Sequence, residues 1–325
     1  MQVRLGKFAK GQTDFFPVMW PVSLSTENVH SLASEPYVVA PKPSGPRFLL
    51  YIDSSGDIFL ENMTQHIFHV DEDHAIKIET FDGRPVTDTV LDGIITSEKF
   101  NGADSSCEGN KEEGNNRKLT FLIRDAIRCN GKDLTNYNIL KRITFVREEI
   151  LIPSCAGVKK NEAFDLDIVK YEEAYQTENY LSDEYAQRFK YPFRSLMFCP
   201  RAKGYKCGTN YDVFQWQEND VQECSFRLKI PKGIKDLKIA ELHAGGPNLS
   251  EIKYDTIRLT EEIKTLDGCI IDCRYFEHQW IFIKQRHDRN HPNGRRAVME
   301  KMAALEKSVS RDLLLTNLEK SRGLE

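Results

Sequence analysis

The sequence has no long apolar run and no excess of positive charge, and both absences exclude whole classes of protein. No stretch approaches the roughly 20 consecutive apolar residues of a transmembrane helix. The first 20 residues hold basic side chains without an apolar segment, so neither a membrane span nor a secretory signal is expected. There are 45 Lys and Arg against 49 Asp and Glu, a net charge of −4. Any binding of nucleic acid must therefore come from a local patch, not from overall charge.

Cysteine is present but is not arranged to bind a metal. None of the eight cysteines forms a CxxC pair, and the closest two, Cys269 and Cys273, have three residues between them. A zinc site normally shows two tight pairs of ligands. We therefore expect no metal site, but reduced thiols packed as small apolar side chains in an intracellular protein.

The composition is that of a chain that folds. Of the 325 residues, 40% are hydrophobic and 10% aromatic, which is enough to bury a core. At roughly 100–200 residues per domain, this length predicts two domains, with one large domain as the alternative.

The first part of the chain mixes predicted helices and strands. A short helix is predicted over 23–34. A hairpin is predicted from the apolar runs 48–53 and 58–60, which a Ser-Ser-Gly-Asp turn separates. The polar stretch 101–117 predicts a surface loop. The acidic stretch 161–190 is predicted to be mostly helical.

From about Cys224 the pattern changes to short β-type runs, whose spacing is typical of a small barrel or sandwich. Apolar residues at helical spacing then predict a closing helix over 296–320. The sequence thus indicates a mixed α+β body over 1–222, followed by a smaller all-β module with its closing helix over 223–325. The β-type runs are residues 226–230, 237–240, 269–273 and 280–283.

Two groups of basic residues are candidates for chemistry. Lys42 begins a Lys-Pro-Ser-Gly-Pro-Arg turn that ends at Arg47, just before a strong strand. A lysine whose pKa is lowered by burial or by nearby cations acts as a nucleophile toward phosphate, and an arginine holds phosphate through paired hydrogen bonds. Residues 284–296 contain five Lys or Arg and one acid, Asp288, which suits a polyphosphate or an RNA 5′ end. Taken singly, each pattern is also that of an ordinary solvated loop.

The order and spacing of these signals resemble the guanylyltransferase part of eukaryotic mRNA capping enzymes, which belongs to the lysine-nucleotidyltransferase superfamily with the DNA and RNA ligases. The resemblance covers nearly the whole chain. The family motif K-x-D-G-x-R reads KPSGPR here, from Lys42 to Arg47. The other matching stretches are 91–94 (LDGI), 121–134 (FLIRDAIRCNGKDL), 211–217 (YDVFQWQ), 224–230 (CSFRLKI) and 280–293 (WIFIKQRHDRNHPN).

The resemblance implies a fold and an activity. The fold is α+β, a nucleotidyltransferase (ATP-grasp-like) domain followed by an OB-fold domain and a C-terminal helix. In that family a lysine attacks the α-phosphate of GTP, and the GMP then passes to the diphosphate end of nascent RNA. Lys42 matches the position of that nucleophile. The positions that the resemblance places around the nucleotide and its phosphates are Arg47, Arg124, Arg194, Trp216, Lys284, Arg286, Asp288 and Arg289.

Several positions depart from the family pattern, and all of them concern chemistry. Acids expected beside the lysine and at a Mg²⁺ site are replaced, as are two lysines and the aromatic ring that would stack on guanine. Phosphoryl transfer depends on positioning and charge stabilisation, to which each group contributes about 2–4 kcal/mol. These losses together indicate a protein without catalysis. Ser44, Ile94 and Arg194 stand in place of acids, and Ser195 stands in place of a glycine. Arg124 replaces the aromatic ring, and Gln215 and Gln217 replace the two lysines.

We therefore predict a guanylyltransferase-like pseudoenzyme, without cofactor, that binds an RNA 5′ end, a cap or a nucleotide, or acts as an interaction module. The alternative is a divergent active guanylyltransferase that uses Lys42, and only this alternative requires GTP and Mg²⁺. A third hypothesis is a structural subunit whose closing helix binds a partner. The predicted partners are an RNA 5′ end or nucleotide and other capping or RNA-processing proteins, with no membrane. The predicted compartment is the nucleus, with the cytoplasm as the alternative.

Overall fold

The computed structural model describes residues 1–11, 16–71, 78–98, 119–155, 163–218, 223–231, 233, 238–287 and 290–323. The chain divides into two compact units. The first unit, called the body, comprises Met1–Leu24, Asn28–Glu218 and Arg311–Glu325. The second, called the barrel unit, comprises Ser25–Glu27 and Asn219–Ser310.

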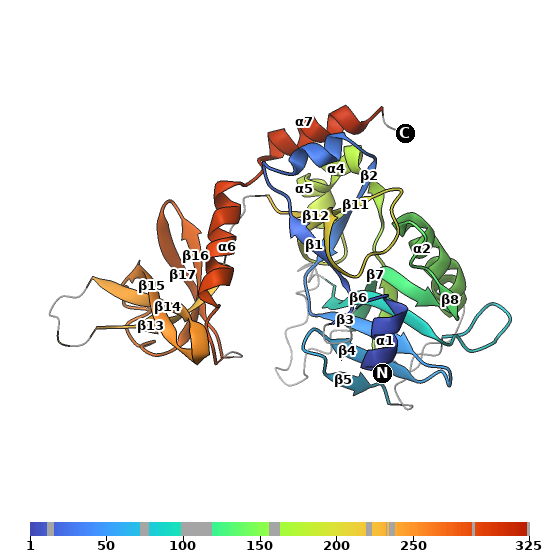
Figure 1. Cartoon of the computed structure of the whole chain (residues 1–325), viewed down its shortest axis with the longest axis horizontal. Coiled ribbons are helices and arrows are strands. Elements are labelled where there is room, and N and C mark those ends of the chain that lie inside the picture. The colour runs from blue at the N-terminus through green and yellow to red at the C-terminus, as the bar shows by residue number, and fades with distance from the viewer. Residues whose placement is uncertain are drawn as a thin grey trace, which may run out of the picture. The chain divides into compact units, whose positions relative to one another are not determined.

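The body contains two sheets, and the smaller one carries Lys42 (Figure 1). Its strands lie in the order β1–β12–β11–β2–β10, and its one parallel pair is β1 with β12. The strands are β1 (Met19–Ser23), β2 (Tyr37–Pro43), β10 (Glu172–Glu173), β11 (Phe193–Pro200) and β12 (Gly208–Trp216).

The larger sheet of the body has seven strands and carries Arg47 and Arg124. Its main path is β5–β4–β3–β6–β7–β8, and β9 adds to β7 as a parallel strand. The strands are β3 (Arg47–Ile52), β4 (Ile58–Asn62), β5 (Ile67–His69), β6 (Thr89–Ser97), β7 (Leu119–Cys129), β8 (Lys132–Asp133) and β9 (Asp165–Ile168).

The core of the body forms two layers, one on each face of the larger sheet. Leu49 of β3 belongs to an apolar cluster that also contains Val38 of β2, in the smaller sheet. Its neighbour Leu50 belongs to a second cluster with Val146. Because successive side chains of a strand point to opposite faces, β3 is buried on both sides, which explains its unbroken apolar sequence.

Helix α2 (Ile139–Val146) covers the larger sheet beside β7. Its N-terminus is capped by Asn138, whose side chain accepts a hydrogen bond from the Lys141 backbone N–H at 3.0 Å. It continues into a π-helical turn (Arg147–Leu151) and α3 (Ile152–Cys155). The other helical segments of the body are α1 (Gln2–Phe8), the 3₁₀ helices η1 (Val29–Ala33) and η4 (Ala174–Gln176), α4 (Thr177–Tyr180), α5 (Asp183–Arg188) and α7 (Arg311–Ser321).

The barrel unit is a closed five-stranded barrel (Figure 1). The strand order is β13–β14–β15–β17–β16, and the third and fifth strands are parallel, which is the arrangement of an OB-fold. Phe226 and Trp280 pack edge to face in its core with ring centroids 4.8 Å apart. The elements are β13 (Glu223–Lys229), β14 (Ile239–Gly245), the 3₁₀ turn η5 (Pro247–Leu249), β15 (Glu251–Arg258), β16 (Ile270–Phe276), β17 (Gln279–Gln285) and α6 (Arg295–Glu306).

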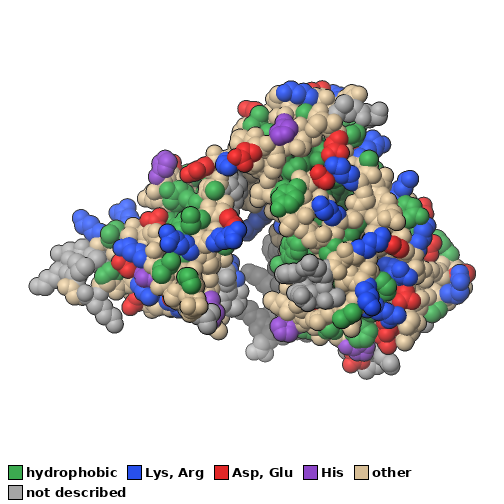
Figure 2. All heavy atoms as spheres, in the orientation of Figure 1, with side chains coloured by type: hydrophobic (Ala, Val, Ile, Leu, Met, Phe, Trp, Pro, Cys, Tyr) green, Lys and Arg blue, Asp and Glu red, His purple; other side chains and the backbone are tan. Residues whose placement is uncertain are grey.

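Charged side chains of both signs are interspersed over the body and the barrel unit on the face drawn in Figure 2. This mixture agrees with the balanced composition of 45 basic and 49 acidic residues. No helix in the described ranges is both long and apolar enough to span a bilayer.

The α+β class, the 48–60 hairpin and the barrel are confirmed, but the helix predicted over 23–34 is wrong. The chain is extended as β1 up to Ser23, and helical structure is limited to η1, Val29–Ala33. The reason is tertiary: Val22 pairs with Phe214 of β12, and the Leu24 backbone N–H donates to the Gln215 carbonyl at 2.8 Å. Pairing with a distant strand outweighs a weak local helix preference.

The acidic stretch 161–190 is less helical than predicted. In its described part, β9 and β10 precede η4, α4 and α5, which are all short. Strand β9 forms here because β7 offers an open edge to residues 165–168. The predicted loop 101–117 lies outside the described residues.

The predicted closing helix over 296–320 is two helices, and the second belongs to the body instead of the barrel unit. The chain leaves α6 at Lys307, whose carbonyl accepts a hydrogen bond from the Thr26 backbone N–H at 2.9 Å. The Ser-Val-Ser sequence that follows is poor in helix formers. Helix α7 then packs on η1. The module predicted over 223–325 therefore ends before α7.

The cysteines whose side chains are described are free thiols, as predicted. Cys129, Cys199, Cys224 and Cys273 are buried. Burial raises the pKa of Cys129 to about 12, so this thiol stays protonated and packs as an apolar side chain.

Helix α7 provides a matched test of this correction. Leu314 is fully buried and its neighbour Leu313 is 37% exposed. We expect Leu314→Ala to destabilise the body by about 2–4 kcal/mol because it leaves a cavity. Leu313→Ala is expected to cost less than about 1 kcal/mol. Urea unfolding followed by circular dichroism measures both. Equal, small effects would contradict the packing of α7 on the body.

Candidate functional site

Lys42 lies near the end of β2, opposite Ser195 of β11. Its ammonium group donates a hydrogen bond to Gln215 Oε1 at 2.7 Å, reaching over β11 to β12. The sequence resemblance predicts a lysine at position 215. The hydrogen bond to the neutral amide of Gln215 instead holds the Lys42 side chain in place.

The charge of Lys42 is opposed by its surroundings. Burial, and then the positive charges of Arg124 and Arg47, lower its pKa from the usual 10.5 to about 8. At pH 7 the amine is mostly protonated, and it loses its proton within the physiological range.

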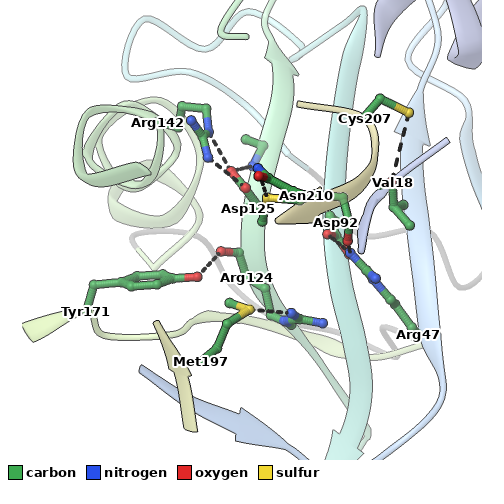
Figure 3. A network of polar contacts seen from close by, with 12 residues as sticks. Val18, Arg47, Asp92, Arg124, Asp125, Arg142, Tyr171, Met197, Cys207 and Asn210 are labelled. Carbon is green, nitrogen blue, oxygen red and sulfur yellow. Dashed lines mark hydrogen bonds and ion pairs between the residues drawn. The ribbon is translucent and has the colours of Figure 1, made fainter. Parts of the chain in front are cut away.

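Arg47, at the start of β3, is buried and committed to Asp92 of β6 (Figure 3). Its Nε donates to Asp92 Oδ1 at 2.8 Å, and its Nη2 donates to the other carboxylate oxygen and to the Met19 carbonyl at 2.9 Å. The Trp20 ring lies 5.0 Å from the guanidinium carbon. Burial opposes the charge of Arg47, but Asp92 outweighs it and holds the Arg47 pKa above its ordinary value.

The turn between Lys42 and Arg47 depends on glycine. Gly45 has a φ of 149°, and a Cβ there would lie 2.1 Å from the Ile95 carbonyl oxygen and 2.8 Å from Ile94 Cγ2. No other residue fits this approach of the turn to β6. The glycine of the family motif is thus retained for a structural reason, although the motif's aspartate is Ser44.

Arg124 of β7 is buried and contacts the smaller sheet through Met197 of β11. Its Nη2 donates to Met197 Sδ at 2.9 Å, and its Nε has no hydrogen-bond partner among the described residues. Burial and the charge of Arg47 lower the Arg124 pKa from its ordinary value. We use the name Lys42 site for Lys42, Arg47, Arg124 and Gln215.

Asp125, next in sequence, is paired with a residue that the sequence did not bring to attention. Arg142 of α2 donates through Nε to Asp125 Oδ1 at 2.6 Å and through Nη2 to Oδ2 at 2.8 Å (Figure 3). Both side chains are buried, and Asp125 outweighs the burial to hold the Arg142 pKa above its ordinary value. One feature of the sequence could have identified Arg142 as a buried partner. It lies between Ile139 and Ile143 on the apolar face of α2.

The residues around Lys42 do not fit the Mg²⁺ ion that the resemblance implies. Mg²⁺ takes carboxylate oxygens, but Asp92 and Asp125 are each bound by an arginine. Ile94 is a buried apolar residue where an acid was expected. Within the described ranges no three His, Cys, Asp or Glu side chains group in a way that could hold a metal ion.

The other predicted site residues belong to the smaller sheet of the body and to the barrel unit. Arg194 is exposed on β11. Trp216 is buried, and as the neighbour of Gln215 on β12 it points to the opposite face of the sheet. In the barrel unit, Lys284 is exposed on β17, and Arg286 donates to Asp272 Oδ2 at 3.1 Å. Asp288 and Arg289 lie outside the described residues.

Sequence reasoning also missed Trp20 and Met197, which touch the two arginines of the site. Both are apolar residues in strands, and nothing in their local sequence distinguishes them from core residues. Their position beside Arg47 and Arg124 follows only from the meeting of the two sheets.

The two units define a nucleotidyltransferase body joined to an OB-fold module. Two family descriptions match the chain: mRNA capping enzyme, catalytic domain, over residues 1–219, and mRNA capping enzyme, C-terminal domain, over residues 197–315. The chain belongs to the mRNA capping enzyme family. The resemblance drawn from the sequence motifs is confirmed at this level.

Known relatives agree with this assignment. The chain is 23% identical to an mRNA-capping enzyme of Danio rerio, in an alignment covering 98% of this chain and 52% of that protein. It is 22% identical to an mRNA-capping enzyme subunit alpha of Schizosaccharomyces pombe, covering 98% and 83%. The chain thus spans about half the length of the Danio relative. A solved structure titled "mycobacterial DNA ligase D complexed with ATP and MES" is similar with a TM-score of 0.47 and 12% identity, over 84% of this chain and 95% of that one.

The lowered pKa of Lys42 is measurable by chemical labelling. Because only the unprotonated amine reacts, we expect acetylation of Lys42 by acetic anhydride to show a midpoint near pH 8. An unperturbed lysine titrates at about 10.4. Mass spectrometry of the digested protein locates the label, and the midpoint should rise in Arg124→Met because a neighbouring charge is removed. A wild-type midpoint of about 10 would contradict the described surroundings of Lys42.

The buried Arg142–Asp125 pair gives a prediction about stability. Arg142→Met leaves the Asp125 carboxylate buried without its partner, and we expect a loss of about 3–5 kcal/mol. The double variant Arg142→Met/Asp125→Leu should recover much of this loss because no charge is left unpaired. Urea unfolding measures both variants. A loss below about 1 kcal/mol in the single variant would show that the pair is not buried in solution.

Proposed function

We propose that this chain is a guanylyltransferase-like member of the capping family that binds a phosphorylated RNA 5′ end or nucleotide at the Lys42 site and does not transfer GMP. The observation that carries the proposal is the state of the charged groups around Lys42. The amine is held by the Gln215 amide, and the carboxylates nearest in the sheets, Asp92 and Asp125, are bound by arginines.

The arrangement supports binding because positive charge in the site exceeds negative charge. Lys42, Arg47 and Arg124 contribute three cations, and Asp92 compensates Arg47. Phosphate groups are the common biological anions that several Lys and Arg side chains recognise together. In the barrel unit, the exposed Lys284 belongs to the basic stretch 284–296, whose composition by itself suits a phosphate group.

The same arrangement speaks against transfer. Formation of a lysine–GMP bond requires an unprotonated amine, an oriented α-phosphate and stabilised charge on the leaving pyrophosphate. By the sequence resemblance, Ser44, Ile94 and Arg194 replace acids of the family pattern. Gln215 and Gln217 replace its lysines. Each such group contributes about 2–4 kcal/mol to the transition state, and their losses are not additive.

One observation favours the alternative of an active guanylyltransferase. With a pKa of about 8, about a tenth of the Lys42 amines are unprotonated at pH 7. Lys42 is thus chemically able to act as a nucleophile. Under either function we assign the protein to the nucleus, where it would work with other capping or RNA-processing proteins.

A labelling assay separates the two functions. The protein is incubated with α-³²P-GTP and Mg²⁺ or Mn²⁺, and acid-stable radioactivity is measured beside Lys42→Ala. We expect wild type and variant to be equally unlabelled. An adduct that forms on the wild type and is absent from Lys42→Ala would overturn the proposal and establish the active enzyme.

A binding assay tests the positive half of the proposal. RNA oligonucleotides of one sequence with a 5′-triphosphate, diphosphate, cap or hydroxyl are titrated by fluorescence anisotropy. We expect at least one phosphorylated or capped end to bind about tenfold or more tightly than the hydroxyl end, since charge-assisted contacts contribute about 1.5–3 kcal/mol. Equal affinities for all four ends would favour the structural-subunit hypothesis instead.

A further inference from the structure

The body contains three buried arginines, Arg47, Arg124 and Arg142, and Arg124 differs from the other two in its partner. Arg142 ends on the carboxylate of Asp125, with two charge-assisted hydrogen bonds. Arg124, 3% exposed, donates to the thioether sulfur of Met197 and has an unpartnered Nε. Figure 3 shows this contrast: Arg47 and Arg142 end on acids, and Arg124 ends beside a sulfur atom.

A buried guanidinium without an anion is costly. A buried charge is normally paired or hydrogen-bonded on all sides, and a thioether is only a weak acceptor. Burial and the charge of Arg47 disfavour the charge of Arg124, and Asp92 offsets only part of this effect, so that the Arg124 pKa lies below its ordinary value. Arg124 in turn disfavours the charge of Lys42, whose ammonium group donates to the neutral amide of Gln215.

Among the described residues, the contacts of Lys42 and Arg124 are an amide oxygen and a thioether sulfur, not a carboxylate. Asp92 favours the charge of Arg124 from a distance, but both of its oxygens accept hydrogen bonds from Arg47. Lys42 is only partly buried, so an anion can reach the pair from the Lys42 side. An anion with several oxygens would accept from both side chains at once and remove their mutual repulsion.

We infer that Lys42 and Arg124 form a metal-independent site for a phosphate group. The ligand would supply the anionic hydrogen-bond acceptor that Arg124 does not have among the described residues. This inference rests on the proposed function and specifies its ligand class: a phosphate chain is bound through its oxygens, without Mg²⁺ and without a contribution from the nucleoside. A carboxylate or sulfate ligand shares part of this chemistry, and the test distinguishes them.

The experiment is a calorimetric titration of the full chain with sodium tripolyphosphate in EDTA. We expect binding to the wild type, competition by GTP without metal, and no competition by guanosine, sulfate or acetate at equal concentration. Binding is expected to weaken by about tenfold or more in Arg124→Met, and to persist in part in Arg124→Lys. The control Lys170→Met removes one exposed charge from the same unit and should leave binding unchanged.

A thermal scan of the same variants separates a ligand-binding arginine from a structural one. If Arg124 binds an anionic ligand, its charge is buried without an anionic partner in the ligand-free protein. Arg124→Met removes this charge, and the melting temperature of the ligand-free protein should stay equal or rise by about 2–4 °C. Arg142→Met, which breaks a satisfied pair, should lower it. A lower melting temperature with unchanged tripolyphosphate binding in Arg124→Met would overturn the inference.

The remaining outcomes are also decisive. If a phosphorylated RNA end binds but tripolyphosphate in EDTA does not, the proposed function stands and the metal-independent site is wrong. If tripolyphosphate binds through Arg124 while Lys42 also becomes guanylylated, the phosphate site stands and the pseudoenzyme proposal is wrong. Competition by guanosine would show that the nucleoside contributes, and would contradict the assigned ligand class.

Discussion

The ion pair between Arg47 and Asp92 is the interaction on which the rest of the site depends. Both residues lie in the larger sheet, and Arg47 also donates to the Met19 carbonyl in the smaller one. The pair therefore ties the two sheets together where the Lys42 turn crosses between them. It also fixes the electrostatics, because an Asp92 bound on both oxygens is not free for a metal. The partly compensated charge of Arg47 still lowers the pKa values of Lys42 and Arg124.

Lys42 and Arg124 thus differ from Arg47 and Arg142, which are paired with carboxylates. Asp125 and Arg142 are joined by two charge-assisted hydrogen bonds, as expected for buried ions. Lys42 and Arg124 share a hydrophobic setting with an amide and a sulfur atom. Proteins that carry such a local conflict usually do so at functional positions. The conflict is the observation that supports the proposed anionic ligand.

The success of sequence reasoning varied with the range of the forces involved. The 48–60 hairpin and four of the five barrel strands followed from local alternation and turn chemistry, and they are present. Strand β15 was missed, and the 23–34 and 161–190 predictions were too helical, because β1 and β9 form only against distant edges at β12 and β7. The single helix over 296–320 failed because α7 packs on η1, almost 300 residues earlier in the chain.

The sequence by itself determined the family and the near-balanced charge, since these are properties of residue identity and order. The role of Lys42 and the replacement of the expected acids and lysines stay predictions from the same source. Only the tertiary structure decided which charges are paired. Whether an arginine meets an aspartate, as Arg142 does, or a methionine sulfur, as Arg124 does, depends on how two sheets and one helix meet. That meeting is fixed by the burial of both faces of the larger sheet, which no local sequence pattern specifies.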